Sequence, residues 1–200
     1  GDKRIKEKMD LDIEVAKLRL LKADYQSRHY RLEDQLLKFF PQQGEQDTQV
    51  RTGLQKDQET AMENPVPEKH FVGMEIKGKA FSDKEAAGEA ILAACKLASS
   101  KDVELGHYRG FSMRLTYDSM ANRMLMVLQG EMSHFVELGT DARGNILRMD
   151  NMLGGIPNRI EAVQAQLENM KQQMEAAKQE LAKPFAQEAE LKTKSTRLAE

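Results

Sequence analysis

The sequence contains no tryptophan and only one cysteine, Cys95, among its 200 residues. A disulfide within the chain is therefore excluded, and this use of cysteine is typical of a reducing cytoplasm. No apolar run approaches the length needed to cross a membrane, and the first residues lack the apolar core of a signal peptide. We therefore expect a cytoplasmic protein with no membrane partner.

An excess of charge of one sign is also lacking. The chain carries 30 Lys and Arg against 32 Asp and Glu, which gives a formal net charge of −2 at pH 7. Modules dedicated to nucleic acid usually show a basic excess. The composition therefore argues against strong non-specific affinity for DNA.

Catalytic motifs are absent as well. The sequence has no phosphate loop GxxxxGK[ST], no GxGxxG, no HExxH and no GxSxG. Cys95 falls on the apolar face of an expected helix, which indicates a structural thiol, and the four histidines are too scattered to suggest a metal site. We predict no catalytic residue, no cofactor and no metal, and we interpret the 12 methionines as core filling rather than as a binding surface.

The first part of the chain has the pattern of a long helix without glycine or proline over residues 3–39. Apolar residues recur there at heptad spacing: Leu11, Leu18, Tyr25, Leu32 and Phe39. A second row, four residues further on, contains Val15 and Leu36, but Lys22 and His29 make it impure. We expect Pro41 to interrupt this helix, and a weaker helix over about 45–63 to end at ENPVPE (63–68).

The last part of the chain repeats the heptad pattern more clearly. One row contains Ile156, Val163, Met170, Ala177, Leu191 and Leu198, and the other contains Ile160, Leu167, Met174 and Leu181. Pro157 falls in the first helical turn, where proline is accepted, whereas Pro184 should kink or restart the helix. The final STRLAE continues the pattern without a cap, so we expect the chain to be a piece of a longer polypeptide.

The two long arms predict an antiparallel helical stalk. Pro41 lies 24 residues before Pro65, and Pro184 lies 27 residues after Pro157. If the arms run side by side, the breaks at Pro41 and Pro184 fall at nearly the same height and form a shared joint. A three-helix bundle, with the first helix folded back, is the open alternative.

Between the arms the periodicity changes to that of strands. We expect strands over residues 71–76, 106–118, 123–130, 134–139 and 146–153. After the first of them we expect a helix over 83–98, capped by Ser82, and then a linker at SSKD (99–102). KGKAF (77–81) should form a turn with a short return. TDARGN (140–145) should form a hairpin turn with Gly144 at positive φ.

Two glycines bracket an aromatic and basic group in GHYRGF (106–111). The structural interpretation is a strand with a bulge or tight bend at these glycines. The functional interpretation presents an aromatic ring to a base and a guanidinium to a phosphate. Further arginines would extend this binding surface to a weak basic strip if they share a sheet face, although nearby acids such as Glu137 can cancel the positive charge of the strip. The candidate nucleic-acid-binding residues are Tyr108, Arg109, Arg114, Arg123 and Arg148.

These patterns together predict an α+β protein in which a long, coiled-coil-like helical stalk carries a small antiparallel sheet domain with one covering helix. We divide it into an N-terminal helical arm (1–64, broken near Pro41), an α+β head (65–155) and a C-terminal helical arm (156–200, broken near Pro184).

Four phrases also suggest a family: FVGMEIKGKAFSDKEAAGEAIL, GHYRGFSMRL, LRMDNML and LAKPFAQEAELKTKSTRLAE. From about Phe39 onward the chain resembles the C-terminal region of very large Swi/Snf-type helicase and adenine-specific DNA methylase polypeptides of bacterial mobile elements. In that family the motor and methylase centres lie upstream, and none of their motifs occurs here. The resemblance implies an accessory module of a DNA-processing protein, and the family's similar pattern around GHYRGF favours Tyr108 and Arg109 as contacts.

We therefore predict a non-catalytic module that positions or contacts DNA or the upstream domains of its own polypeptide. The alternative is a protein-interaction or oligomerisation module that self-associates through the coiled-coil seam of its helical arms. An enzyme in its own right is disfavoured, because no catalytic motif is present.

Overall fold

The computed structural model describes residues 1–98 and 101–200, apart from the side chain of Lys69. The predicted linker over 99–102 therefore lies partly outside the described residues. The chain divides into two compact units, a helical unit (1–46 and 167–200) and a sheet unit (47–166), and we describe each by itself. No described helix is both long and apolar enough to cross a membrane.

The helical unit begins with α1 (Asp2–Asp34), which passes through a π-helical turn (Gln35–Phe39) into α2 (Phe40–Glu63). The turn ends two residues before Pro41, which has no backbone N–H to donate to the preceding helical turn. The N–H of Phe40 instead reaches back to the carbonyl of Gln35. The predicted interruption is thus a change of helix type, and the first helix does not fold back into a bundle.

The π-helical turn shifts the heptad seam by one residue, because it contains one residue more than an α-helical turn. Leu11, Val15, Leu18 and Leu32 keep to the predicted rows and are buried or half-buried. Beyond the turn, Phe40 is buried while Phe39 is 54% exposed. The prediction that Phe39 belongs to the seam is therefore wrong by one position.

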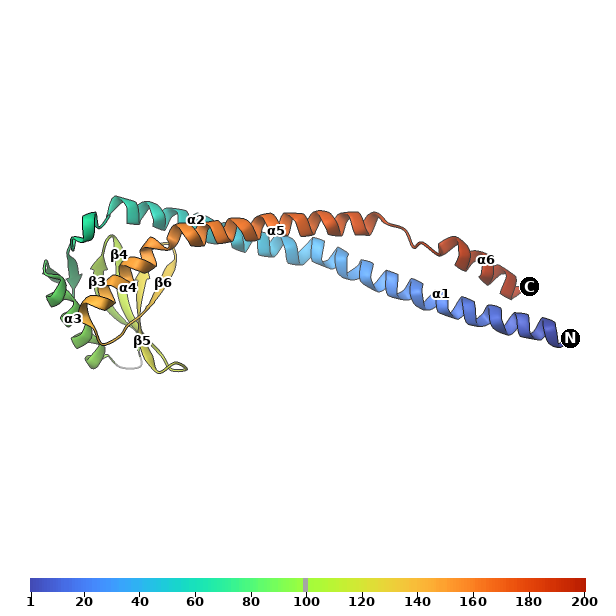
Figure 1. Cartoon of the computed structure of the whole chain (residues 1–200), viewed down its shortest axis with the longest axis horizontal. Helices are drawn as coiled ribbons and strands as arrows, with labels where there is room; N and C mark the ends of the chain where they lie inside the picture. Colours follow the sequence, from blue (N-terminus) through green and yellow to red (C-terminus); the bar gives the residue numbers. More distant parts are fainter. Residues whose placement is uncertain (99–100) are drawn as a thin grey trace. The chain divides into compact units, whose positions relative to one another are not determined.

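Within the helical unit, α1 lies alongside the end of α5 (Ile156–Ala182) and α6 (Glu188–Ala199) in antiparallel orientation (Figure 1). Contacts step in opposite directions along the two segments: Val15 with Leu191, Tyr25 with Lys183, His29 with Glu180, and Gly44 with Met170. The predicted antiparallel pairing of long helices is confirmed.

Pro184 separates α5 from α6, as predicted, and this break leaves helical carbonyls without partners inside their own helix. Two side chains of α1 satisfy them. The hydroxyl of Tyr25 donates to the carbonyl of Lys183 (2.5 Å), and Nε2 of His29 donates to the carbonyl of Glu180 (3.1 Å).

The impure row of the seam faces this break. Nζ of Lys22 forms an ion pair (2.9 Å) with Glu188 in the first turn of α6, and His29 caps α5 beside it. Because Tyr25, and not Pro41, lies opposite the break, the predicted joint shared by the two prolines is not formed.

The sheet unit contains a six-stranded antiparallel sheet in the order β2-β1-β3-β4-β5-β6. Its strands are β1 (Met74–Ile76), β2 (Lys79–Phe81), β3 (Val103–Tyr108), β4 (Phe111–Asp118), β5 (Arg123–Gln129) and β6 (Ser133–Glu137). A short 3₁₀ turn (Pro67–Lys69) precedes the sheet. The α+β class is confirmed.

Helices α3 (Lys84–Leu97) and α4 (Ala142–Gly154) pack with this sheet (Figure 1). Leu54 and Ala61 of α2 and Ile160 of α5 belong to the same core, so the sheet unit extends beyond the predicted head, 65–155, at both ends. Asp83, rather than Ser82, caps α3, because its carboxylate accepts the N–H of Ala86 (3.0 Å).

Helix α4 replaces the predicted hairpin turn and last strand. The carboxylate of Asp141 accepts the N–H of Gly144 (3.0 Å), so TDARGN begins a helix and Gly144 lies in its first turn. Ile146, Met149 and Leu153 are buried at helical spacing. The prediction of a strand over 146–153 is wrong, and two helices rather than one cover the sheet.

GHYRGF forms the tip of the β3–β4 hairpin. Arg109 (φ 51°) and Gly110 (φ 83°) are its two left-handed turn residues, a combination typical of tight hairpins. Gly106 lies at a bulge in β3, where an added Cβ would overlap the carbonyl of Glu75. The predicted bulge and tight bend at these glycines are therefore confirmed. The prediction of one strand over 106–118 is wrong, because the bend reverses the chain and separates β3 from β4.

Two helical glycines give a matched test of this packing. A Cβ on Gly88 of α3 would overlap the backbone of Ala142, whereas Gly154 of α4 has open space around it. We expect Gly88→Ala to lower the free energy of unfolding by about 1–3 kcal/mol and Gly154→Ala to raise it by about 0.5–1 kcal/mol. Urea titration followed by circular dichroism measures both, and equal effects would contradict the close approach of α3 and α4.

Candidate nucleic-acid interface

Tyr108 and Arg109 are turned into the sheet unit. Tyr108 is 1% exposed, and its hydroxyl donates to Asp150 of α4 (2.7 Å). Burial and the Asp150 carboxylate raise the pKa of this hydroxyl. Arg109 pairs with the same carboxylate (3.1 Å) and donates to the carbonyl of Asn64 (2.8 Å). These two side chains tie the hairpin to α4 and to the end of α2, and this packing leaves little of either for a ligand.

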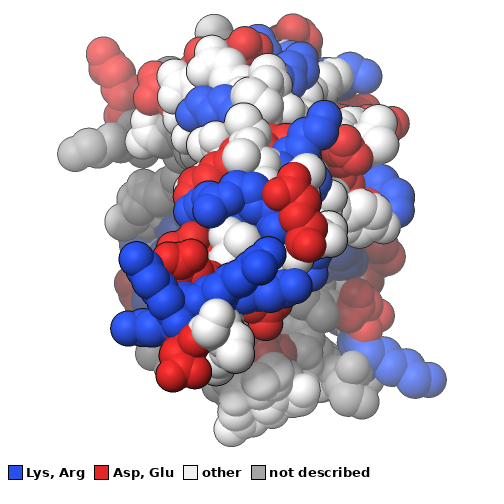
Figure 2. Space-filling model, turned by 90° about the vertical axis from the view of Figure 1, so that its right-hand side faces the viewer, with Lys and Arg blue, Asp and Glu red and all other residues white. Residues whose placement is uncertain are grey.

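Arg114 and Arg123 carry acidic partners. Arg114 of β4 pairs with Asp102 (3.5 Å), and Arg123 of β5 pairs with Glu137 of β6 (2.9 Å). Basic and acidic side chains are also interspersed at the end of the helical unit that carries both termini, which faces the viewer in Figure 2. The structure does not gather the predicted arginines into one basic strip.

Arg148 differs from the other four predicted residues. Its Nη1 donates to the backbone carbonyl of Glu137 (3.1 Å), and within the described chain it forms no ion pair with a carboxylate. It borders a groove of about 520 Å³ between β6, α4 and the start of α5. We call this the β6–α4 groove; its lining includes Phe135, Glu137, Arg148, Asn151, Met152 and Arg159.

A second guanidinium, that of Arg159, faces the same groove. Its Nη2 donates to the carbonyl of Met152 (3.3 Å), and it too has no ion-pair partner among the described residues. Burial lowers the pKa of Arg159, and the field of Asp57 opposes that shift. A guanidinium has five N–H donors, so a half-buried one with a single protein acceptor favours an anion from outside.

Phe135 supplies an aromatic face beside these cations. It lies on β6, which is the edge strand of the sheet, and its side chain is 51% exposed. An exposed aromatic ring next to unpaired guanidiniums is the combination with which proteins stack a base and hold a phosphate.

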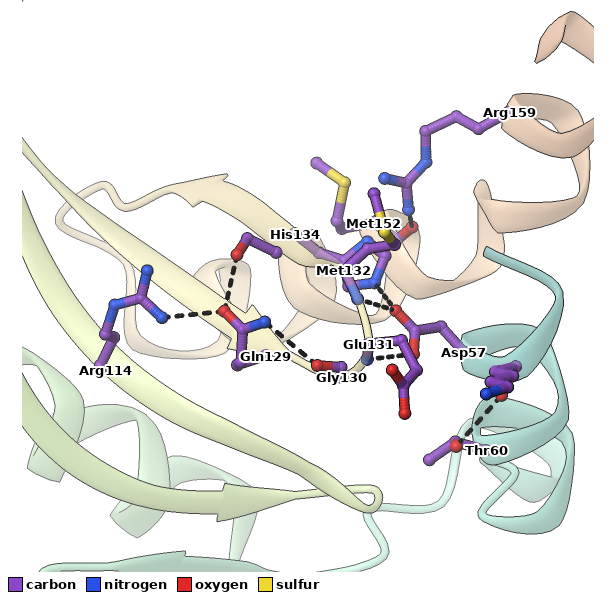
Figure 3. A network of polar contacts seen from close by, with 12 residues as sticks. Asp57, Thr60, Arg114, Gln129, Gly130, Glu131, Met132, His134, Met152 and Arg159 are labelled. Atoms are coloured by element: carbon purple, nitrogen blue, oxygen red, sulfur yellow. Dashed lines mark hydrogen bonds and ion pairs between the residues drawn. The ribbon is translucent and has the colours of Figure 1, made fainter. Parts of the chain in front are cut away.

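A buried polar network fixes the start of β6 (Figure 3). Asp57 of α2 is 1% exposed, and its carboxylate accepts the N–H groups of Glu131 (2.7 Å) and Met132 (2.9 Å) in the β5–β6 turn. Nε2 of His134 donates to the same carboxylate (2.6 Å). Gly130 lies at the start of this turn, and the position requires glycine because an added Cβ would overlap the Asp57 carboxylate.

The Asp57–His134 pair acts as a structural tie. His134 is fully buried, and its Nδ1 has no hydrogen-bond partner among the described residues. Burial lowers the pKa of His134, while the bond to Asp57 opposes this shift. No grouping of His, Cys, Asp or Glu in the described ranges could hold a metal ion.

Sequence reasoning missed Phe135 and Arg159. The alternation in HFVEL does place Phe135 on the face opposite His134 and Val136, but it does not indicate which face is covered. Arg159 lies two residues after Pro157, at the start of a helix. Its position beside β6 depends on α4, for which the sequence predicted a strand over 146–153.

Comparison with protein-family models, with curated proteins and with solved structures gives no match.

The buried histidine predicts acid sensitivity. His134 stays neutral when folded, whereas in the unfolded chain it binds a proton below about pH 6.5. The free energy of unfolding should therefore fall as the pH drops below 6.5, with a limiting slope of about 1.4 kcal/mol per pH unit from this group. His134→Gln, which can still donate to Asp57, should flatten the slope. Denaturation at a series of pH values measures this.

The matched control is His70→Gln, because His70 is exposed and lies outside the network. An unchanged pH slope in His134→Gln would contradict a neutral, buried imidazole.

Proposed function

We propose that this chain is a non-catalytic accessory module of a DNA-processing polypeptide and that it contacts single-stranded nucleic acid through the β6–α4 groove. The family resemblance of its sequence supports the polypeptide context, including a cytoplasmic setting and upstream domains as neighbours. The observation that carries the contact is Phe135 beside Arg148 and Arg159, two guanidiniums without a carboxylate partner.

The groove suits a flexible strand better than a duplex. An unstacked base can lie on Phe135, a contact that contributes about 1–3 kcal/mol in single-strand binding proteins. The adjacent phosphates can then reach Arg148 and Arg159. Because only two cations take part and the net charge is −2, binding should be weak and should not resemble that of a basic DNA-binding domain.

The salt dependence tests the number of phosphate contacts. With two contacts, log K should fall against log salt with a slope of about −1.4, or about 25-fold for a tenfold rise in salt. Fluorescence anisotropy with a labelled single-stranded oligonucleotide measures this slope. Arg148→Gln or Arg159→Gln should each reduce it by about 0.7, whereas Phe135→Ala should weaken binding at every salt concentration without changing it.

Arg143→Gln is the matched control for these variants. Arg143 also lies on α4, but it is paired with Glu85 and is not part of the groove lining. Absence of binding at low salt, or equal losses in Arg143→Gln and Arg148→Gln, would refute the proposal. Tyr108→Ala and Arg109→Ala are unsuitable probes, because both residues anchor the hairpin.

A further inference from the structure

Helix α1 carries a second line of apolar residues, separate from its seam with α5 and α6. Its members follow at alternating spacings of four and three residues: Met9, Ile13, Ala16, Leu20, Ala23 and Tyr30. We call this line the outer stripe. Ser27 interrupts it once, and it ends where Asp34 and the π-helical turn follow.

The outer stripe has no partner within the helical unit. Leu20 is 72% and Tyr30 is 71% exposed, and every other member of the stripe is also exposed. Leu20 lies two residues after Leu18 of the seam, which places it about 200° around the helix. Single exposed apolar residues need no explanation, but a heptad-spaced line spanning about 32 Å of helix, at 1.5 Å per residue, has the form of a coiled-coil face.

We propose that the outer stripe binds the outer stripe of a second copy of this chain, with the two α1 helices parallel and in register. This surface is distinct from the β6–α4 groove, so the inference does not depend on the proposed function. It also differs from the heptad seam through which self-association was predicted from the sequence, because α5 and α6 already occupy that seam on α1.

The charges flanking the stripe support a second copy and a parallel orientation. Ile13 and Leu20 take a positions of this heptad, and Ala16 and Ala23 take d positions. In a parallel pair, the residue just before an a position faces the residue five positions further along on the other helix. Asp12 then faces Lys17, and Arg19 faces Asp24. Two-fold symmetry repeats both contacts, so the pair gains four attractive contacts.

An antiparallel pair that matches Leu20 with Ala23 also has opposite charges facing each other, Lys17 with Asp24 and Asp10 with Arg31. It adds a contact between like charges, Asp12 with Glu33, which symmetry repeats and which the parallel pair avoids. Exposed ion pairs add little affinity, but they do decide partner and orientation. The alanines and Ser27 make the core shallow, so the dimer should form reversibly with rising concentration.

Sedimentation of the whole 200-residue chain tests the association. The average mass should rise from the 22.7 kDa of one chain toward twice that value over an about hundredfold increase in concentration. Leu20→Glu should keep the protein monomeric throughout. Leu21→Glu is the matched control, because Leu21 is the adjacent leucine, is 48% exposed and lies off the stripe, and this variant should still dimerise.

Cross-linking tests the orientation. In a Cys95→Ala background, Ala16→Cys should form a disulfide-linked dimer under mild oxidation, because parallel register places this position opposite itself. In the antiparallel pair Ala16 faces Ser27, and the cross-link should not form. Ser119→Cys, an exposed position in the sheet unit, controls for random collision.

Four results would overturn the inference. They are a monomer at every concentration, a dimer that survives Leu20→Glu, a dimer lost equally in Leu21→Glu, and a dimer in which Ala16→Cys cross-links no better than Ser119→Cys. Circular dichroism of each variant separates loss of association from loss of helix.

Discussion

The sheet unit depends on the hydrogen bonds of the Asp57 carboxylate, which joins α2 to the β5–β6 hairpin. This carboxylate is buried, and it accepts two backbone N–H groups and one imidazole N–H from the β5–β6 hairpin. Removing it would leave those donors unsatisfied in the interior, at about 1–3 kcal/mol for each. The same carboxylate joins α2 to β6, the edge strand of the sheet, through His134. Phe135 is the next residue on β6 and points to the opposite face, so the bond between Asp57 and His134 also fixes the position of Phe135.

The helical unit follows a similar rule, in which buried or interrupted backbone groups must find partners. Pro184 ends α5, and the freed carbonyls are met by Tyr25 and His29 from α1. Of the two polar residues that interrupt the heptad row, His29 meets one of these carbonyls and Lys22 pairs with Glu188 just beyond the break. An impure coiled-coil position can in this way mark the place where the partner helix is interrupted.

The sequence predicted those features that depend on local periodicity. The antiparallel heptad seam, the strands β4 to β6 and the α3 helix all follow from spacing, and each is present. The single strand predicted over 106–118 is instead the end of β3, a hairpin turn and β4. Residues 146–153 were misassigned because Asp141 and Gly144 suit a hairpin turn as well as a helix N-terminus, although Ile146, Met149 and Leu153 already have helical spacing. The shift from Phe39 to Phe40 could not be read from spacing at all, because it comes from one extra residue in a π-helical turn.

The candidate interface is assembled by tertiary contacts, and of its residues the sequence predicted only Arg148. Tyr108 and Arg109 have the right chemistry for nucleic acid, but the same chemistry lets them share Asp150, a residue that lies on a helix the sequence reading made a strand. The groove is assembled from β6, α4 and α5, and no short motif contains all three. Arg148 and Arg159 differ from the other arginines of the sheet unit that have been described, because neither forms an ion pair with a described residue. Glu137 also lines the groove, and Asp57 acts on Arg159 without pairing with it. The chain pairs Arg109, Arg114, Arg123 and Arg143 with its own acids. Arg148 and Arg159 instead border one groove beside an exposed ring and have donors left for an external anion.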